Sequence, residues 1–200
     1  MKVFQPQGQE GFEWIVPVNE NDFEFLTTLN GTRHKNRWTP LPMRLITDDE
    51  GESFKESDFP WLGYHVPVLS DRARRVVEPL VEKDAELLPV ACEGRSLWLL
   101  NVCTIVDALD LERSEIMRFE SSGRIMDIKR HVFYPDRLEG IDVFKLENMR
   151  RGSTYLSARV MRAIEAAPLV GYGFRVVWTD EEGAEPPVAG PVVDPGPAAE

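Results

Sequence analysis

The sequence has little cysteine, no long hydrophobic run and no leader-like start, and each absence argues against a class of protein. Among 200 residues the only thiols are Cys92 and Cys103, both inside apolar runs, so we expect buried free thiols and no disulfide. No stretch of roughly 18 apolar residues occurs, which argues against a membrane-spanning helix. The first residues lack the basic stretch, apolar core and cleavage site of an export signal. We therefore expect a cytoplasmic protein.

Positive charge is also scarce. The chain has 23 Lys and Arg against 34 Asp and Glu, which gives a formal net charge of -11. An acidic surface repels the phosphates of nucleic acids and anionic lipids, so neither nucleic acid nor membrane is predicted as a direct partner. A basic protein partner is favoured instead. Six of the acids lie in residues 180–200, which contain no Lys or Arg, so the rest of the chain carries an excess of only five acidic residues.

The sequence motifs of common enzymes are missing as well. The chain contains neither the Gly-x-Ser-x-Gly turn of many hydrolases nor the Gly-x-x-x-x-Gly-Lys loop that binds nucleotide phosphates. His34, His65 and His131 are widely separated, and none occurs in the spacing of a metal site. We therefore predict no catalytic residues, no metal and no cofactor. The alternative is a small enzyme that uses His65 or His131 together with scattered carboxylates.

Two segments show the spacing of amphipathic helices. One begins at Ser70, a good N-cap residue, and its interior Pro79 predicts a bend or an early end. The other begins at Ser157 and is ended by Pro168 and Gly171. The two segments match at an offset of 87 residues, in the pairs Leu69/Leu156, Ser70/Ser157, Arg72/Arg159, Arg75/Arg162 and Glu78/Glu165.

A strand is expected after each helix at a similar distance, at residues 87–92 and 174–178. This pattern predicts a helix-then-strand unit that occurs twice, although any two amphipathic helices share some matches by chance. Further strands are expected at residues 12–18, 41–47, 97–102, 125–134 and 141–146, and a short helix at residues 21–29. Because the middle strands have no helices between them, we predict an α+β fold with a mostly antiparallel sheet.

The composition divides the chain into three parts. Residues 1–63 mix strand and loop signals and are expected to pack on the main domain, an α+β domain over residues 64–179. Residues 180–200 combine Pro, Gly and acidic residues with too little apolar mass to offset the entropy of ordering. We expect this last part to be a disordered acidic tail.

An acidic loop with aromatic residues lies in the N-terminal part. Carboxylates steer a basic partner into encounter, and a neighbouring aromatic side chain can supply the apolar contact that slows dissociation. The candidate partner-binding residues are Asp48, Asp49, Glu50, Glu52, Phe54, Glu56, Asp58, Phe59 and Trp61. The alternative is a solvated loop without a partner. The basic stretch at residues 33–38 resembles a nucleic-acid patch, but in so acidic a chain we interpret it as a solvated turn or an internal salt-bridge partner.

Several short motifs follow one another between residues 69 and 145. They are Leu69-Ser70-Asp71-Arg72, Glu86-Leu87-Leu88-Pro89-Val90, Leu99-Leu100-Asn101-Val102, Val106-Asp107-Ala108-Leu109-Asp110, Ser114-Glu115, Val132-Phe133, Gly140-Ile141 and Phe144-Lys145. In order and spacing they resemble the immunity protein 11 family of bacterial polymorphic toxin systems. The resemblance covers residues 64–179, so residues 1–63 and the acidic tail lie outside it.

This resemblance implies a cytosolic antidote, encoded beside its toxin, that protects the producing cell and its kin by binding a cognate toxin, often a nuclease. It implies no catalytic residues, and it carries over no set of binding residues. We therefore predict an immunity protein that occludes the active groove of a basic toxin with an acidic, aromatic-bearing face. Two alternatives stay open, an enzyme that acts on the toxin or its product and a regulatory binding module without a toxin.

Overall fold

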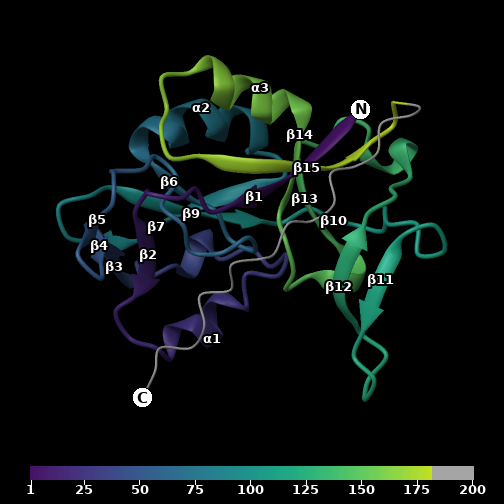
Figure 1. Ribbon diagram of the computed structural model, residues 1–200, viewed down its shortest axis with the longest axis horizontal. Coiled ribbons are helices and arrows are strands. Elements are labelled where there is room, and N and C mark those ends of the chain that lie inside the picture. The colour runs from purple at the N-terminus through teal and green to yellow at the C-terminus, as the bar shows by residue number, and fades with distance from the viewer. Residues whose placement is uncertain (182–200) are drawn as a thin grey trace.

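The computed structural model describes residues 1–181, which form three α-helices and short strands grouped in several sheets (Figure 1). Most strand pairs are antiparallel, and the predicted α+β fold is confirmed. Residues 182–200 of the predicted tail lie outside the described residues. No helix in residues 1–181 is long and apolar enough to cross a membrane. Both cysteines are free and half-buried, so the prediction of free thiols is confirmed.

The first structural unit contains the helix predicted from Ser70. Its elements in chain order are β6 (Val68–Ser70), α2 (Asp71–Val81), β7 (Ala85–Pro89) and β9 (Leu97–Val102). The Ser70 hydroxyl accepts a hydrogen bond from the Ala73 amide, so Ser70 is the N-cap as predicted. Pro79 lies in the last turn of α2, and the helix ends at Val81. Strand β9 runs antiparallel between β6 and β7.

The second structural unit has the same order of elements around the other predicted helix. Its elements are β14 (Tyr155–Ser157), α3 (Ala158–Ala166), β15 (Gly173–Thr179) and, from the start of the chain, β1 (Lys2–Gln7). Ser157 caps α3 by accepting from the Arg159 and Val160 amides. Strand β1, which the sequence pattern did not reveal, runs antiparallel between β14 and β15.

The strands of the two units pair in equivalent registers. In the first sheet Trp98 of the central strand lies opposite Leu69 and Pro89. In the second sheet Phe4 of the central strand lies opposite the residues 87 positions further along the chain, which are Leu156 and Val176. The offset found in the sequence therefore extends from the helices to the strands on both sides. The repeated helix-then-strand unit is confirmed as a repeated strand-helix-strand unit.

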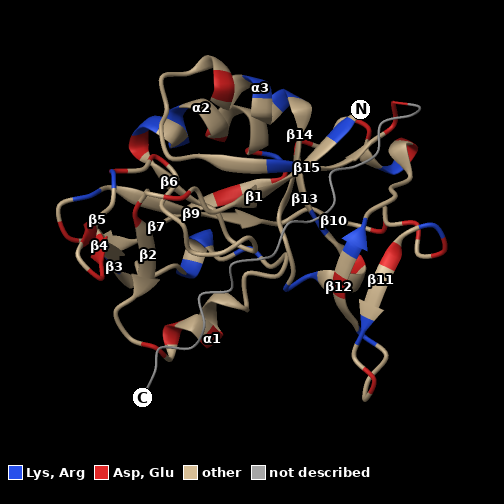
Figure 2. Cartoon of the chain, in the orientation of Figure 1, with Lys and Arg blue, Asp and Glu red and all other residues tan. Residues whose placement is uncertain are grey.

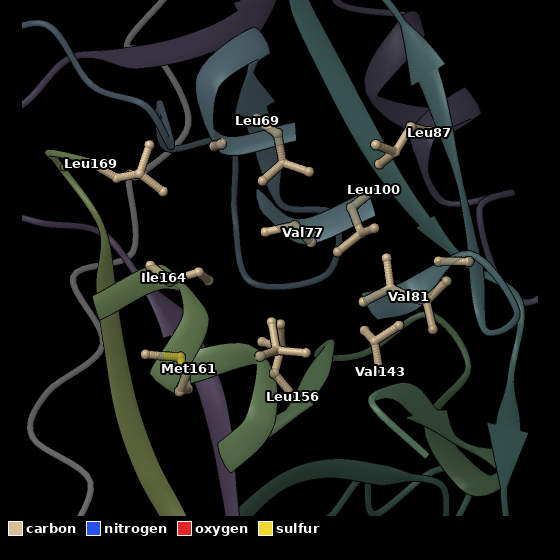
Figure 3. Packing of buried hydrophobic residues seen from close by; sticks show 14 residues of the cluster. Leu69, Val77, Val81, Leu87, Leu100, Val143, Leu156, Met161, Ile164 and Leu169 are labelled. Carbon is tan, nitrogen blue, oxygen red and sulfur yellow. The ribbon is translucent and has the colours of Figure 1, made fainter. Parts of the chain in front are cut away.

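The two helices pack on each other and on both sheets around one hydrophobic core. Figure 3 shows this core, to which α2 contributes Val77 and Val81 and α3 contributes Met161 and Ile164. Leu100, Val143 and Leu156 from the strands complete the core, and Val143 lies next to Val81. Burial of these side chains is the main favourable term that holds the two units together.

Further strands extend the second unit. Strand β13 (Val143–Leu146) pairs with β14, and β10 (Ile105–Val106) pairs in parallel with β13, which gives the order β10-β13-β14-β1-β15. A second, aromatic core lies beside this sheet and contains Phe133, Phe144, Tyr155 and Trp178. Strands β11 (Glu115–Arg118) and β12 (Ile125–Arg130) form a separate hairpin at the side of the molecule (Figure 1).

The first 63 residues form part of the sheets. Besides β1, they supply β2 (Trp14–Pro17) and β3 (Pro42–Ile46), which pair with each other and, through β3, with β8 (Ala91–Cys92). The short helix expected within residues 21–29 is α1 (Asp22–Leu26). A third core of aliphatic residues, including Ile15, Leu26 and Leu88, fills the space between these elements and the first unit.

Two buried aspartates fix the starts of the paired helices. In the Asp58 cluster (Asp58, Ser70 and Arg72), Oδ1 of Asp58 accepts hydrogen bonds from the Ser70 hydroxyl at 2.5 Å and from Nε of Arg72 at 3.1 Å. Arg72 also donates to the carbonyl of Pro168, just after α3. The start of the first helix is thereby attached to the end of the second.

The Asp142 cluster (Asp142, Ser157 and Arg159) repeats this arrangement in the second unit. The Oδ1 atom of Asp142 accepts from the Ser157 hydroxyl at 2.8 Å and from Nε of Arg159 at 3.0 Å. Arg159 also donates to the carbonyl of Leu80, in the last turn of α2. The two clusters thus link the antiparallel helices at both ends.

We predict that Asp58→Asn lowers the free energy of unfolding at neutral pH by about 2 kcal/mol, because it weakens charge-assisted hydrogen bonds to a buried carboxylate. Burial raises the pKa of Asp58, but hydrogen bonds from Arg72, Ser70 and Val170 outweigh it and hold the pKa below its ordinary value. The contribution is therefore present above the ordinary carboxyl pKa and is lost as the pH falls through the lowered one. Urea denaturation measures the loss.

The matched control is Asp48→Asn, which removes the same charge from an exposed position. It should change the free energy of unfolding by less than about 0.5 kcal/mol. Equal effects of the two substitutions would show that the Asp58 cluster does not stabilise the fold.

Candidate protein-binding surfaces

The predicted acidic loop forms a small hairpin at the surface. Strands β4 (Asp48–Asp49) and β5 (Glu52–Ser53) pair across a two-residue turn. All four of its carboxylates are exposed, and Figure 2 shows them as a red segment at the edge of the molecule. The hairpin therefore presents a local concentration of negative charge to solvent.

The turn of this hairpin has an unfavourable residue at its tip. Glu50 has φ of 47° and Gly51 has φ of 89°, as a type I′ turn requires. The first of these positions normally holds Asn, Asp or Gly, because other residues are strained in the left-handed region. Glu50 is the one non-glycine residue among residues 1–181 with a positive φ. The hairpin thus keeps a carboxylate where local conformation disfavours it.

The aromatic residues of the predicted loop pack against the body of the protein. Phe54 is half-buried and stacks on Trp14, with ring centroids 6.3 Å apart. Phe59 packs edge-on against Tyr172 and Phe174 beside the main core. Trp61 is half-buried, with its ring against Gly8. These side chains hold the loop in place, and Phe54 is the one that lies next to the exposed carboxylates.

The acidic residues of the loop divide into two groups. Glu56 is exposed like the hairpin carboxylates, and it lies 3.5 Å from Arg95. Asp58 is only 5% exposed and belongs to the Asp58 cluster, so its carboxylate faces the interior. Two acidic residues only two positions apart therefore differ in exposure, with Glu56 at the surface and Asp58 in the interior. The surface group comprises Asp48, Asp49, Glu50, Glu52 and Glu56.

The basic stretch at residues 33–38 is fixed to the first unit. It forms a short 3-10 turn, Lys35–Arg37, and the Trp38 indole donates to the carbonyl of Pro89 at 2.7 Å. The backbone amides of His34 and Lys35 both donate to the buried carboxylate of Glu86. The stretch is thus a turn that attaches to a buried acid mainly through its backbone.

Sequence reasoning missed a second surface, formed by residues 18–25. Val18, Phe23 and Phe25 are 59%, 45% and 38% exposed. Three acidic residues, Glu20, Asp22 and Glu24, lie between them in the sequence. The available sequence signal was the interleaving of Phe23 and Phe25 with acidic residues.

The histidines do not converge with carboxylates. His131 lies in the aromatic core, with Nε2 3.0 Å from the Tyr155 hydroxyl, and burial together with the charge of Arg175 lowers its pKa to about 3. Burial and the charge of Lys145 lower the pKa of His65 to about 4. Both imidazoles are therefore neutral at physiological pH. Within residues 1–181, no three His, Cys, Asp or Glu side chains are placed to hold a metal ion.

Lys145 is a buried base without an acidic partner. Its side chain is fully buried, and its Nζ donates to the carbonyls of His65 at 2.7 Å and Gly152 at 2.9 Å. No carboxylate of residues 1–181 forms an ion pair with it. Burial lowers the pKa of its amine from 10.5 to about 7. Through these two hydrogen bonds Lys145 connects β13 to the segment that precedes β6 and to the segment that precedes β14.

We predict that Lys145→Met removes a pH dependence of stability. The unfolded chain keeps the Lys145 proton up to its ordinary pKa, whereas the folded protein releases it near pH 7, so wild-type stability rises with pH above 7. The variant should gain less stability than the wild type on going from about pH 7 to about pH 9. Urea denaturation at both pH values measures this difference. An identical gain in both proteins would contradict the lowered pKa.

The comparison with known families agrees with the motifs between residues 69 and 145. A model of the Imm11 immunity protein family matches residues 66–179, more than half of the chain. The match includes both structural units except β1, and the β4–β5 hairpin and α1 lie before it. No curated protein matches the chain. The chain belongs to the Imm11 immunity protein family.

Proposed function

We propose that this protein is the immunity partner of a toxin that it binds and neutralises without covalent chemistry. The toxin is a basic, nucleic-acid-binding protein such as a nuclease, encoded by a neighbouring gene, and the antidote acts in the cytoplasm of the producing cell and its kin. Membership of the Imm11 family is the observation that carries the proposal. The exposed carboxylates of the β4–β5 hairpin support the basic character of the partner.

The hairpin has the charge needed to compete with nucleic acid. A nuclease groove must be positive to hold the phosphate backbone, so a surface of closely spaced carboxylates is attracted to the same groove. The unfavourable conformation of Glu50 supports this use, since strained residues that persist in a fold concentrate at functional sites. The proposed contact residues are the surface group of the acidic loop together with Phe54.

Neutralisation sets a lower limit on affinity. Almost no toxin can remain free in the cell, so we expect a dissociation constant in the nanomolar range or below, or a binding free energy on the order of -12 kcal/mol. An inhibitor of this kind acts at one antidote for each toxin. An enzyme that modifies the toxin or its product would act below that ratio, so titration of toxin activity separates the two functions.

We predict that the variant Asp48→Asn, Asp49→Asn, Glu50→Gln, Glu52→Gln binds the toxin about tenfold or more slowly at low salt, because it removes the charge that steers the encounter. Wild-type association should slow as salt increases, while the association of the variant should depend on salt much less. Stopped-flow or biosensor kinetics with the product of the neighbouring gene measure both rates.

The control variant is Glu112→Gln, Glu115→Gln, Glu120→Gln, Asp127→Asn, which makes the same change in net charge on and beside the β11–β12 hairpin. All four of these residues are exposed. If the two variants associate with the toxin equally slowly, the net charge of the protein steers association and the β4–β5 hairpin has no special part in it. Toxin that binds without loss of activity would contradict neutralisation itself.

A further inference from the structure

Exposed apolar side chains cluster on residues 18–25. Among residues 1–181, nine large apolar side chains are exposed, and three of them, Val18, Phe23 and Phe25, lie within these eight residues. Single exposed apolar residues are common on protein surfaces, but a local cluster is typical of an interaction site. We call this cluster, with its acidic neighbours Glu20, Asp22 and Glu24, the α1 surface.

The α1 surface lies on a short helix that buries only one of its side chains. Leu26 and the following Leu29 face the third core and are almost fully buried. Leu26 is the one buried residue of α1 itself, whereas Phe23 and Phe25 are exposed. Phe25 is supported by the rings of His34 and Trp38, whose centroids lie 6.2 and 5.9 Å away. Phe23 has no aromatic neighbour among the described residues and is free to contact a partner.

The charge around Phe23 is of one sign. Asp22 and Glu24 flank Phe23 in the sequence, Glu20 lies three residues before it, and residues 18–25 contain no Lys or Arg. The basic residues Lys35 and Arg37 belong to the turn that precedes Trp38, whose ring contacts Phe25. The part of the α1 surface that contains Phe23 therefore fits a basic protein surface with an apolar depression.

The α1 surface and the β4–β5 hairpin lie at opposite ends of one strand pair. The Val18 amide donates to the Pro42 carbonyl at the start of β3, whereas the hairpin follows the end of β3 at Ile46. The strand between them spans about 16 Å. This distance exceeds the Debye length of about 8 Å, so the two acidic groups act on an approaching charge separately. A strand of this length is shorter than the width of a standard protein interface, so a partner that covers the strand pair can reach both of its ends.

We propose that the α1 surface is a second contact for the same toxin, in which Phe23 inserts into an apolar depression and slows dissociation. This inference rests on the proposed function and assigns different tasks to the two surfaces. Charge on the β4–β5 hairpin changes the rate of encounter, while a buried aromatic side chain changes the rate of release. The acidic residues beside Phe23 orient the basic partner.

The test is the dissociation rate of the toxin from Phe23→Ala, measured by biosensor kinetics with the product of the neighbouring gene. We expect dissociation to become about 30-fold faster while association changes by less than about threefold. Phe119→Ala is the matched control, because Phe119 is also 45% exposed but lies beside the β11–β12 hairpin. It should leave both rates unchanged, and both variants should keep the thermal stability of the wild type.

The outcomes separate this inference from the proposed function. If wild type and Phe23→Ala release the toxin at the same rate, or if Phe119→Ala accelerates release equally, the α1 surface is not the anchor and neutralisation is unaffected. If the wild type does not bind the toxin, the proposed function fails and the inference fails with it. If Phe23→Ala accelerates dissociation of the toxin and Phe119→Ala does not, the result supports both the proposed function and the role of the α1 surface.

Discussion

The arrangement of the molecule depends on the two buried aspartate clusters, which attach each helix start to segments distant in the sequence. Asp58 joins the N-terminal part to α2 and, through the Val170 amide, to the segment after α3. A buried carboxylate must keep its donors, so neither segment can move away without leaving a charge unpaired. Ser57, just before it, donates to the Gly171 carbonyl. The segment that follows the β4–β5 hairpin is therefore held in place by these hydrogen bonds. A hairpin on a rigid segment would lose less conformational entropy on binding a partner.

The family match and the folded unit have different limits. The match begins at residue 66, yet β1 is the central strand between β14 and β15, so the second unit is completed by the start of the chain. Pro6 hides this strand in the sequence, because proline is rare in central strands. The register explains why it is tolerated: β14 pairs only with Val3 and Phe4, so at Pro6 the strand has a neighbour on one side only.

Local signals were sufficient for the helices and for most of the longer strands, with β1 as an exception, and long-range pairing was not visible. Ser70 and Ser157 were recognised as caps because a capping hydroxyl acts within three residues. Strands β6 and β14 escaped notice since three residues are too few to show an alternation. In the candidate site, too, local features were visible in the sequence and long-range contacts were not. The acidic turn was found from composition, but Asp58 could not be told from Asp48, because its partners Ser70, Arg72 and Val170 are set by the fold.

The matched segment and the residues before it contribute different parts of the structure. The helices and most of the strands around the main core lie within residues 66–179, whereas the β4–β5 hairpin and the α1 surface precede them. Electrostatic attraction alone binds a partner weakly at cellular ionic strength, because the field of a surface charge decays within about 8 Å. The burial of apolar area is not screened by salt. A tight inhibitor therefore needs both kinds of surface on one rigid frame. On the proposed function, the shared fold supplies the frame, and the first 65 residues supply the surfaces that select one partner.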